Sequence, residues 1–245
     1  MVTRERFKVY GNVFDRYTLN NLDRLAARHL FDELKSSVSI GKEANIFTAS
    51  KGDDLIIVKI YRLVSCNFNK MFEYLKQDPR LTGLNKQRRK VIFAWTKREY
   101  RNLLKARDAG IDVPTPLDVL DNILLLEDLG DSDGPALQLK DVDFAELGLE
   151  QAQKVYKAVA HSMKKLHKAG LVHGDLSSFN ILLHKKRPYF IDFSQATVKK
   201  SYQYDELLDR DISNIASFFS KIGVDADADR LRKEITGKDI AGSNP

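Results

Sequence analysis

Three oxygen-bearing side chains in one short stretch could carry out phosphoryl transfer. Asp175, within the motif His173–Leu176, is followed by Asn180 and, after a short apolar hairpin, by Asp192. An aspartate that positions the attacking oxygen, with an asparagine and a second aspartate that hold magnesium on the phosphates, is the set this chemistry needs. Loops also favour Asp and Asn for structural reasons, so a single one would indicate little. The full set at hairpin spacing favours a kinase-type site.

Lys59 is a second candidate. It lies in the apolar stretch Leu55–Tyr61, which is typical of a β-strand. Alternation along the strand places Lys59 on the same face as Leu55, Ile57 and Tyr61. A lysine on an apolar face must pair with a carboxylate or lose its charge, whereas on an edge strand it would extend its amine into solvent. The first alternative predicts a buried acidic partner.

Glu99 is the predicted partner of Lys59. Trp95, Glu99 and Leu103 are spaced i, i+4 and i+8, so Glu99 lies on an apolar helical stripe that faces inward. A buried Lys59–Glu99 pair would direct the lysine toward nucleotide phosphates, as in kinase sites.

The segment before Lys59 is a weaker candidate for a phosphate loop. Ile40, Gly41 and Lys42 precede an apolar stretch, but only one glycine is present and the pattern G-x-G-x-x-G is absent. By itself the segment is a turn that enters a strand. In this context we expect Gly41 and Lys42 to cover the phosphates with backbone N–H groups and one positive charge.

The histidines indicate no metal site. His173 is predicted to brace the backbone of its loop, and His29, His161, His167 and His184 lack metal-ligand spacing. The sequence also contains no H-E-x-x-H motif, nucleophile elbow or Walker A motif.

The elements that must position these residues are segregated by kind along the chain. Strand-like stretches dominate the first half and helical stretches the second, so we predict an α+β protein of two lobes. The predicted helices cover about 17–34, 91–109, 149–168 and 204–219, and the predicted strands cover 40–49, 55–61, 119–126 as a hairpin, 181–183 and 189–191.

Composition excludes several classes of protein. With 245 residues, 43% of them hydrophobic and 30% charged, the chain is long and apolar enough for a sizeable core. No apolar run could span a bilayer and no signal-peptide core follows Met1, so we expect a cytoplasmic protein without a membrane partner. Cys66 is the only cysteine, which excludes an internal disulfide and multi-cysteine metal sites and fits a reducing compartment.

The net charge of +6 is concentrated in one segment. Residues 76–90 alone carry +5 and contain Pro79 and Gly83, which predicts a mobile basic loop. The loop could be a solvated tether, or it could contact RNA electrostatically. Thr82 is its only hydroxyl and a candidate autophosphorylation site. The residues predicted to contact RNA are Lys76, Arg80, Lys86, Arg88, Arg89 and Lys90.

The sequence resembles the RIO family of atypical protein kinases over nearly its whole length. The pieces Gly41–Asn45 (G-K-E-A-N) and Ile191–Gln195 (I-D-F-S-Q) are specific to that family, whereas HGDL…N is shared with aminoglycoside and other small-molecule kinases. The type-one branch is the most similar, because the stretch before Gly41 is too short for the winged-helix domain of the type-two branch. The short chain without long tails resembles archaeal members.

The resemblance implies a role for each candidate residue. Asp175 is the implied catalytic aspartate, Asn180 and Asp192 are the metal ligands for Mg²⁺ or Mn²⁺, and Lys59 with Glu99 orients the phosphates of ATP. Asp192 is a second catalytic residue, because it can receive the phosphoryl group as an acyl-phosphate. The ATP-binding set is Ile40, Gly41, Lys42, Lys59, Glu99, Glu127, Leu129 and Ser177, with Glu127 and Leu129 in the hinge that binds adenine.

The resemblance also implies a domain order. It gives an N-terminal helical extension over 1–38, an N-lobe over 39–126 with a flexible loop at about 76–90, a hinge over 127–135 and a C-lobe over 136–245. Ser177 stands where ordinary protein kinases have a lysine, and no Ala-Pro-Glu segment follows Asp192. We therefore expect a C-lobe without the usual activation loop and peptide-docking helices.

The predicted function is that of an atypical serine/threonine protein kinase and ATPase that autophosphorylates and acts in maturation of the small ribosomal subunit. Its partners would be ATP and the pre-ribosomal particle, which it would contact through the basic loop. One alternative is a small-molecule phosphotransferase of the aminoglycoside-kinase type, which should have a long helical C-terminal region. Another is an RNA-binding scaffold that keeps a kinase fold without catalysis.

Overall fold

The computed structural model describes residues 14–81, 83–131 and 134–237, which form two compact units. Unit 1 comprises the chain up to Arg101 together with Thr115–Asp128, and unit 2 comprises Asn102–Pro114 and the chain from Leu129 onward. Several predictions fall outside the described residues, namely those for 1–13 in the N-terminal extension, Thr82, 132–133 in the hinge and 238–245 in the C-lobe.

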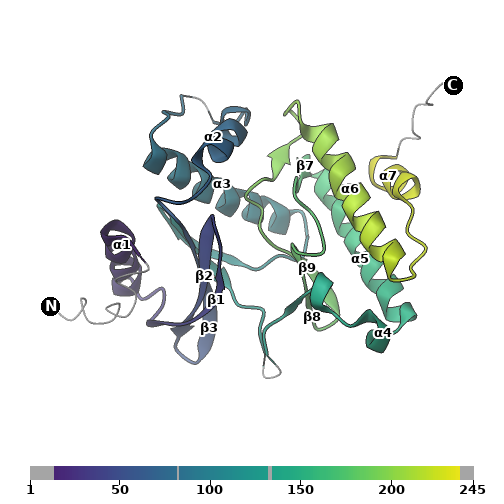
Figure 1. Cartoon of the computed structure of the whole chain (residues 1–245), viewed down its shortest axis with the longest axis horizontal. Helices are drawn as coiled ribbons and strands as arrows, with labels where there is room; N and C mark the ends of the chain where they lie inside the picture. Colours follow the sequence, from purple (N-terminus) through teal and green to yellow (C-terminus); the bar gives the residue numbers. More distant parts are fainter. Residues whose placement is uncertain (1–13, 82, 132–133, 238–245) are drawn as a thin grey trace. The chain divides into compact units, whose positions relative to one another are not determined.

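Unit 1 is built on an antiparallel five-stranded sheet in the order β1-β2-β3-β5-β4. Figure 1 labels its strands β1, β2 and β3. The strands are β1 (Glu33–Ile40), β2 (Ala44–Lys51), β3 (Asp54–Tyr61), β4 (Pro116–Leu120) and β5 (Ile123–Glu127). β3 is central, because it pairs with β2 on one side and with β5 on the other. The strand that was expected to carry Lys59 is therefore not an edge strand.

Helix α1 (Arg16–Ala27) covers one face of this sheet. Asp15 caps the helix, since its carboxylate accepts hydrogen bonds from the backbone N–H groups of Tyr17 and Thr18. The buried side of α1 packs into a core cluster with the alternate β3 residues Ile56, Val58 and Ile60. The remaining face of β3 is thus left for Lys59 and Tyr61.

The predicted helical extension to residue 38 is wrong in its second part. Helix α1 ends at Ala27, the chain turns at His29, which has a φ of 56°, and Glu33–Ile40 is a strand. Phe31 and Leu34 do have helical spacing, but both enter the sheet core from the turn and from β1. Residue spacing alone could not indicate that Glu33–Ile40 pairs with β2 across the short turn at 41–43.

The basic loop is shorter and more anchored than predicted. Lys76 is the last residue of α2 (Phe68–Lys76), and Arg88 begins α3 (Arg88–Asp108), which leaves residues 77–87 as the connection. Asp78, the only acid of the segment, is buried and pairs with Arg80 and with the buried Arg98 of α3. The prediction of a mobile loop over 76–90 is therefore wrong at its two ends and at Asp78.

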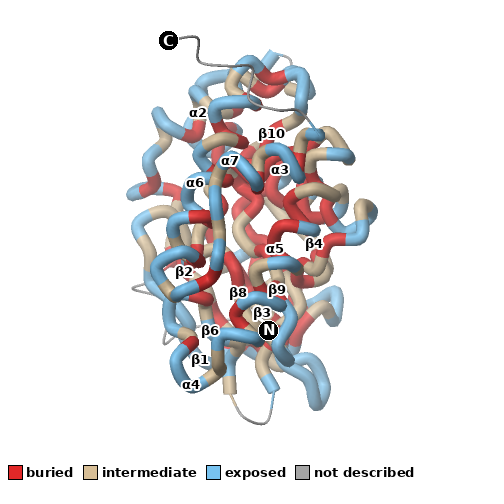
Figure 2. The backbone as a smooth tube through the Cα atoms, turned by 90° about the vertical axis from the view of Figure 1, so that its right-hand side faces the viewer, coloured by how far each residue is buried: buried red, intermediate tan, exposed pale blue. Residues whose placement is uncertain are grey.

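Unit 2 is mainly helical. Helix α7 (Ala228–Thr236) packs against both α5 (Leu149–Lys168) and α6 (Tyr204–Lys221), as Figure 1 shows. Each helix has a buried side and an exposed side, so buried and exposed stretches alternate along the chain (Figure 2). The predicted helices over 149–168 and 204–219 are confirmed nearly to the residue.

Small strands in unit 2 position the loops. The sheet β6-β8-β9 contains β6 (Leu137–Gln138), β8 (Ile181–His184) and β9 (Arg187–Phe190), and a separate pair joins β7 (Leu171–Val172) to β10 (Thr197–Val198). Lys185 and Lys186, with φ values of 49° and 64°, make the tight turn between β8 and β9. The short elements α4 (Phe144–Leu147) and the 3₁₀ turn Leu139–Asp141 precede α5.

None of the described helices has the length and apolar character needed to cross a membrane.

Candidate functional site

In unit 1 the predicted lysine and glutamate form a buried ion pair. Lys59 Nζ lies 2.7 Å from Glu99 Oε1, and the residues are 6% and 0% exposed. Lys59 comes from the central strand β3 and Glu99 from the inward side of α3. The pairing predicted from two independent sequence patterns is therefore confirmed.

Tyr61 completes this pair. Its hydroxyl donates a 2.5 Å hydrogen bond to Glu99 Oε2, and the Lys59 ammonium lies 5.2 Å from the centroid of its ring. Each carboxylate oxygen of Glu99 thus accepts from a different donor, which fixes the rotation of the carboxylate. The sequence placed Tyr61 on the correct face but gave it no role.

The predicted phosphate loop is the turn between β1 and β2. Gly41 N–H donates to Ala44 O at 3.0 Å, and a Cβ built on Gly41 would lie 2.8 Å from that oxygen. A side chain at this position would therefore force the turn to move. Lys42 is exposed, and Ile40, at the end of β1, is 60% exposed.

The predicted hinge residues fall on both sides of the boundary between the units. Glu127 ends β5 in unit 1, and its Oε2 accepts from the backbone N–H and the hydroxyl of Thr115 at 2.9 and 2.6 Å. Leu129 belongs to unit 2 and is buried. The chain crosses between the units at Asp128, near the start of the predicted hinge.

In unit 2 the loop between β7 and β8 brings Asp175 and Asn180 together. Asn180 Nδ2 donates to the backbone oxygen of Asp175 at 2.7 Å and makes a longer, 3.4 Å contact with its Oδ2. The amide nitrogen of Asn180 is therefore committed to the loop, and its Oδ1 is the atom that could hold a metal. Ser177 shapes the same loop, because its backbone oxygen accepts from Asn180 N–H at 3.0 Å.

The β8–β9 hairpin brings the chain at Asp192 back to the loop of Asn180. Ile191 N–H donates to Asn180 O at 3.0 Å, so the chain immediately before Asp192 is fastened to Asn180, the other predicted metal ligand. Asp192 itself has a φ of 60°, a left-handed conformation that is uncommon for a residue with a side chain and that is often found at functional sites. Its Oδ1 lies 3.4 Å from the N–H of Ser194.

His173 braces this loop, as the sequence predicts. It is fully buried, its Nε2 lies 2.9 Å from Ile191 O, and its ring packs 4.6 Å from that of Phe193. The histidine therefore links the segment before Asp175 to the segment around Asp192 through a backbone oxygen.

Sequence reasoning missed Asp211, which holds the backbone on both sides of Asp175. Its two carboxylate oxygens accept from Gly174 N–H and Leu176 N–H, each at 2.8 Å. The residue is 1% exposed, and burial raises its pKa to about 7 against the lowering effect of these two hydrogen bonds. Asp211 thus positions the loop of Asp175 from α6.

Three further side chains fasten the same loops. Arg210 donates to Gly174 O, and Asn214 donates to Leu176 O at 3.1 Å. Asn102, at the start of the α3 portion in unit 2, is fully buried and donates to Phe193 O at 3.0 Å and to Ala196 O at 2.8 Å.

A signal for Asp211 was present in the sequence. Leu207, Asp211 and Ile215 are spaced four apart, so this aspartate lies on an apolar helical stripe as Glu99 does. The same argument that identified Glu99 would have identified Asp211. It would not have revealed the hydrogen-bond partners of Asp211, because every residue except proline has a backbone N–H group.

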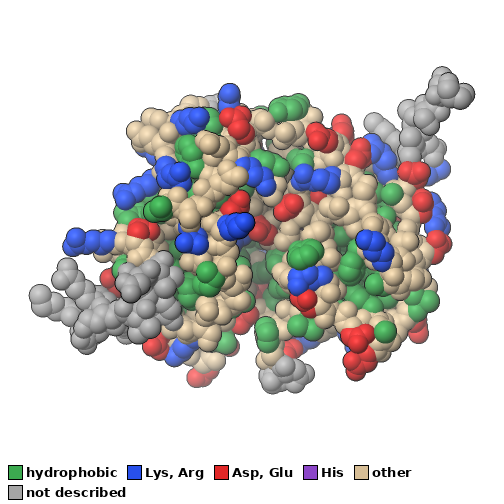
Figure 3. All heavy atoms as spheres, in the orientation of Figure 1, with side chains coloured by type: hydrophobic (Ala, Val, Ile, Leu, Met, Phe, Trp, Pro, Cys, Tyr) green, Lys and Arg blue, Asp and Glu red, His purple; other side chains and the backbone are tan. Residues whose placement is uncertain are grey.

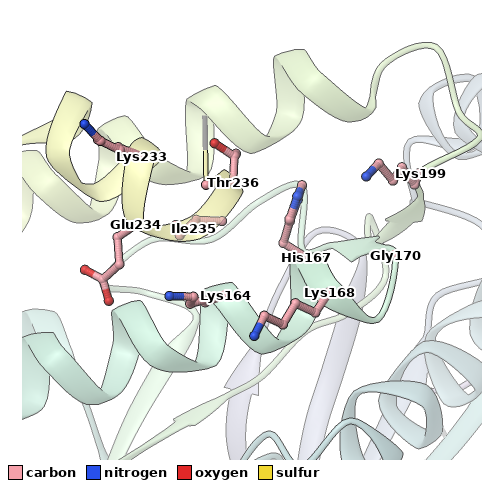
Figure 4. A pocket seen from close by; sticks show the side chains of 10 residues that line it. Lys164, His167, Lys168, Gly170, Lys199, Lys233, Glu234, Ile235 and Thr236 are labelled. Carbon is pink, nitrogen blue, oxygen red and sulfur yellow. The ribbon is translucent and has the colours of Figure 1, made fainter. Parts of the chain in front are cut away.

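A pocket of about 510 Å³ lies elsewhere in unit 2. Figure 4 shows its lining from α5, from α7 and from the segment after β10, with Lys164, Lys168 and Lys199 among the side chains. It contains none of the predicted site residues. Across 14–81, 83–131 and 134–237, no group of three or more His, Cys, Asp or Glu residues is arranged to hold a metal ion.

Comparisons with known proteins show a family relationship. A model of the RIO domain matches residues 45–231. Rio1 of Haloferax volcanii, named a RIO-type serine/threonine-protein kinase, is 39% identical over 234 residues, which cover 95% of this chain and 79% of that protein. The protein of the same name from Methanocaldococcus jannaschii is 39% identical over 237 residues, covering 96% and 80%.

More distant similarity extends to eukaryotes and to another kinase-like fold. The serine/threonine-protein kinase rio1 of Schizosaccharomyces pombe is 36% identical over 215 residues, covering 86% of this chain and 43% of that protein. A solved structure of WaaP in complex with acyl carrier protein matches with a TM-score of 0.57 at 17% identity, covering 97% of this chain and 88% of that one. At such low identity the likeness shows the fold alone, and it confirms the predicted α+β kinase-like architecture.

Proposed function

We propose that this chain, which belongs to the RIO family of serine/threonine protein kinases, transfers the γ-phosphoryl group of ATP to an acceptor on the protein itself. The chain is an enzyme of the ATP-dependent kinase class by virtue of that membership. The identity of the acceptor, the use of magnesium and the biological partner are the parts that we propose here.

One observation carries the proposal more than any other. The β8–β9 hairpin fastens Ile191 to Asn180, and Asn180 in turn bonds to Asp175, so the three predicted side chains meet in one loop system of unit 2. Asp175 would accept the proton of the attacking hydroxyl or orient it, as the catalytic aspartate of kinases does. Lys59, oriented by Glu99, would bind the phosphates from unit 1.

Asn180 and Asp192 fit a magnesium ion. Both offer hard oxygen donors, and the amide of Asn180 is oriented by its bonds to Asp175 so that its oxygen is the atom left for a metal. Magnesium is usually held by one or two protein oxygens together with substrate phosphates and water. When bound, the ion would neutralise charge on the phosphates during transfer.

We further propose that Asp192 can serve as the acceptor. A carboxylate oxygen of Asp192 would form a bond to the γ-phosphorus while the bond from that phosphorus to the bridging oxygen breaks, and ADP would leave with the electron pair. Water would later hydrolyse the aspartyl-phosphate and release phosphate, which completes an ATPase cycle. With a hydroxyl as acceptor, the proton would pass to Asp175 and the product would be a stable phosphoester.

Labelled ATP separates these outcomes. The protein is incubated with γ-labelled ATP and magnesium, and the label on the protein is tested for stability to acid and to hydroxylamine. Hydroxylamine-labile label that disappears in Asp192→Asn supports the aspartyl-phosphate, and acid-stable label supports Ser or Thr. If wild-type protein neither binds labelled ATP nor releases phosphate, while remaining folded, the proposed function is wrong.

The basic segment, residues 76–90, supports a polyanionic partner. We propose that this partner is the RNA of the pre-ribosomal small subunit in the cytoplasm. Lys and Arg side chains gather over α2 and the start of α3 in Figure 3. Three cations of residues 76–90 lie over aromatic rings, with Lys86 over Phe72, Arg88 over Phe68 and Arg89 over Tyr17, each about 5 Å from the ring centroid. Interleaved cations and aromatic rings suit phosphates and stacked bases.

Salt dependence tests this partner. The triple variant Lys86→Gln, Arg89→Gln, Lys90→Gln leaves Arg88 in place, because its guanidinium donates to Val64 O. We expect this triple variant to bind ribosomal RNA more weakly than wild type. The slope of its log Kd against log salt concentration should be lower by roughly two to three. A control variant removes three exposed lysines of unit 2 by Lys154→Gln, Lys157→Gln and Lys221→Gln. Equal losses in both variants would contradict a contact at the basic segment.

A further inference from the structure

We propose that Gln195 is a positioning residue for the catalytic aspartate, an inference that rests on the proposed function of Asp175. Gln195 Nε2 donates a 3.0 Å hydrogen bond to Asp175 Oδ2. The two residues lie 20 positions apart in the sequence, in the loop before β8 and in the loop between β9 and β10. Gln195 thus connects the loop that carries Asp192 to the side chain that would receive or orient the proton.

Asp175 Oδ2 is held from two sides. Asn180 Nδ2 approaches the same oxygen at 3.4 Å, so amide nitrogens from two different loops converge on it. The backbone of Asp175 is held separately, through the bonds that Asp211 accepts from Gly174 and Leu176. Asp211 therefore fixes the main chain, and the two amides fix the rotation of the carboxylate. That rotation sets where Oδ1 lies.

The backbone of Gln195 is placed accurately enough for this role. Asn102 restrains this loop, because its amide donates to Phe193 O and Ala196 O, on either side of Gln195. Gly174, directly before Asp175, lies close to Gln195, because a Cβ built on it would be 3.0 Å from Gln195 O. With a φ of 79°, position 174 already favours glycine, and the close approach adds a second reason.

A neutral amide donor suits this place electrostatically. It stabilises the ionised carboxylate and adds no charge beside the phosphates, whereas a lysine would compete for them and a carboxylate would repel Asp175. The length of Gln195 also matters, because a shorter amide on the same backbone would fall short of Oδ2. The structure therefore gives a reason for the glutamine of the I-D-F-S-Q segment that concerns catalysis rather than packing.

Two substitutions of nearly the same shape test the role. Gln195→Met keeps length and volume but removes the donor, and Gln195→Glu keeps the shape but places an acceptor against Asp175. We expect kcat for ATP turnover to fall roughly tenfold in Gln195→Met, the size of a lost hydrogen bond to a charged group, and further in Gln195→Glu. KM for ATP should change less than about twofold, since Gln195 would touch no part of the nucleotide.

The controls separate this inference from the proposed function. Gln153→Met, on the exposed side of α5, should leave kcat unchanged, and thermal unfolding should show that all variants are folded. If Gln195→Met and Gln195→Glu keep wild-type kcat while Asp175→Asn is inactive, the positioning role is wrong and the proposed function stands. If Asp175→Asn itself keeps wild-type turnover, the proposed function fails. If each Gln195 variant that loses kcat also loses a corresponding amount of unfolding free energy, Gln195 has a structural role alone.

Discussion

The two units hold their predicted site residues in different ways. In unit 1, Lys59 and Glu99 come from a central strand and a long helix, and they are almost completely buried. In unit 2, Asp175, Asn180 and Asp192 lie in loops and at the end of a hairpin and are only partly buried. Regular elements hold the first set, whereas side chains bonded to loop backbone hold the second.

Because of this difference, substitutions in the two units should differ in their effects on folding stability and on reaction rate. A buried ion pair that loses one partner leaves an uncompensated charge, so folding and function fail together. A partly exposed loop carboxylate can lose its charge with little effect on folding, because water already solvates part of it. We therefore expect substitutions in unit 1 to change both properties and substitutions of the unit 2 carboxylates to change mainly the rate.

The largest effect on rate is expected for Asp175→Asn. Loss of a general base should lower kcat by roughly 10²–10⁴-fold. The free energy of unfolding should stay within about 1 kcal/mol of wild type, since no buried charge is left unpaired. Steady-state phosphate release and urea titration measure the two quantities. A large loss of stability in this variant would break the contrast between the units.

Lys59→Met should reduce both properties. It removes the ammonium that balances the charge of the buried Glu99 carboxylate, so we expect a loss of about 3–5 kcal/mol in the free energy of unfolding. Phosphate orientation should fail as well, with a drop in kcat/KM. The double variant Lys59→Met, Glu99→Gln removes the buried charge, and it should regain most of the stability without regaining activity. Recovery of activity in the double variant would argue against a role for Lys59 in binding phosphates.

Asp211 is the exception in unit 2, because it is a buried charge that serves a loop. Burial raises its pKa from 3.8 to about 7, so between these values the folded protein binds more protons than the unfolded chain. The free energy of unfolding should therefore fall as pH rises from about 4 to about 7, by up to about 1.4 kcal/mol per pH unit from this group. The cost is absent below that window and complete above it.

Asp211→Asn removes this titration and one of the two backbone acceptors. Urea unfolding at several pH values should show a flatter profile between pH 4 and 7 than in wild type. Turnover should fall roughly tenfold, because Gly174 or Leu176 loses its partner and the catalytic loop relaxes. Parallel pH profiles of stability for the two proteins would show that Asp211 is ionised without cost.

The smallest effect is expected at the turn between β1 and β2. Gly41→Ala would bring a Cβ to 2.8 Å from Ala44 O, so the turn must shift and KM for ATP should rise a few-fold. Gly52→Ala is a matched control at the β2–β3 turn, where no atom lies within 4 Å but φ is +61°. It should cost about 1 kcal/mol of stability without changing KM. An equal rise of KM in both variants would exclude a specific phosphate-loop role for Gly41.

Much of the fold could be predicted because its patterns are local. Helical spacing gave α5 and α6 almost to the residue, and alternation placed Lys59 and Tyr61 on the face opposite the α1 core. The errors have a common cause. The helix predicted through Leu34 and the loop predicted through Lys90 were both judged from local spacing and charge, while pairing with β2 and the buried Asp78–Arg98 contact decided the outcome.

The sequence by itself determined the chemical groups of this protein and the faces on which the regular elements carry them. Tertiary structure alone decided which backbone groups meet those side chains. Glu99 and Asp211 occupy equivalent apolar stripes, yet one pairs with a lysine and the other with two backbone N–H groups. Every residue has the same backbone donor and acceptor, so a sequence cannot specify such contacts, and only the folded chain brings Asp211 and Gln195 to the loop of Asp175.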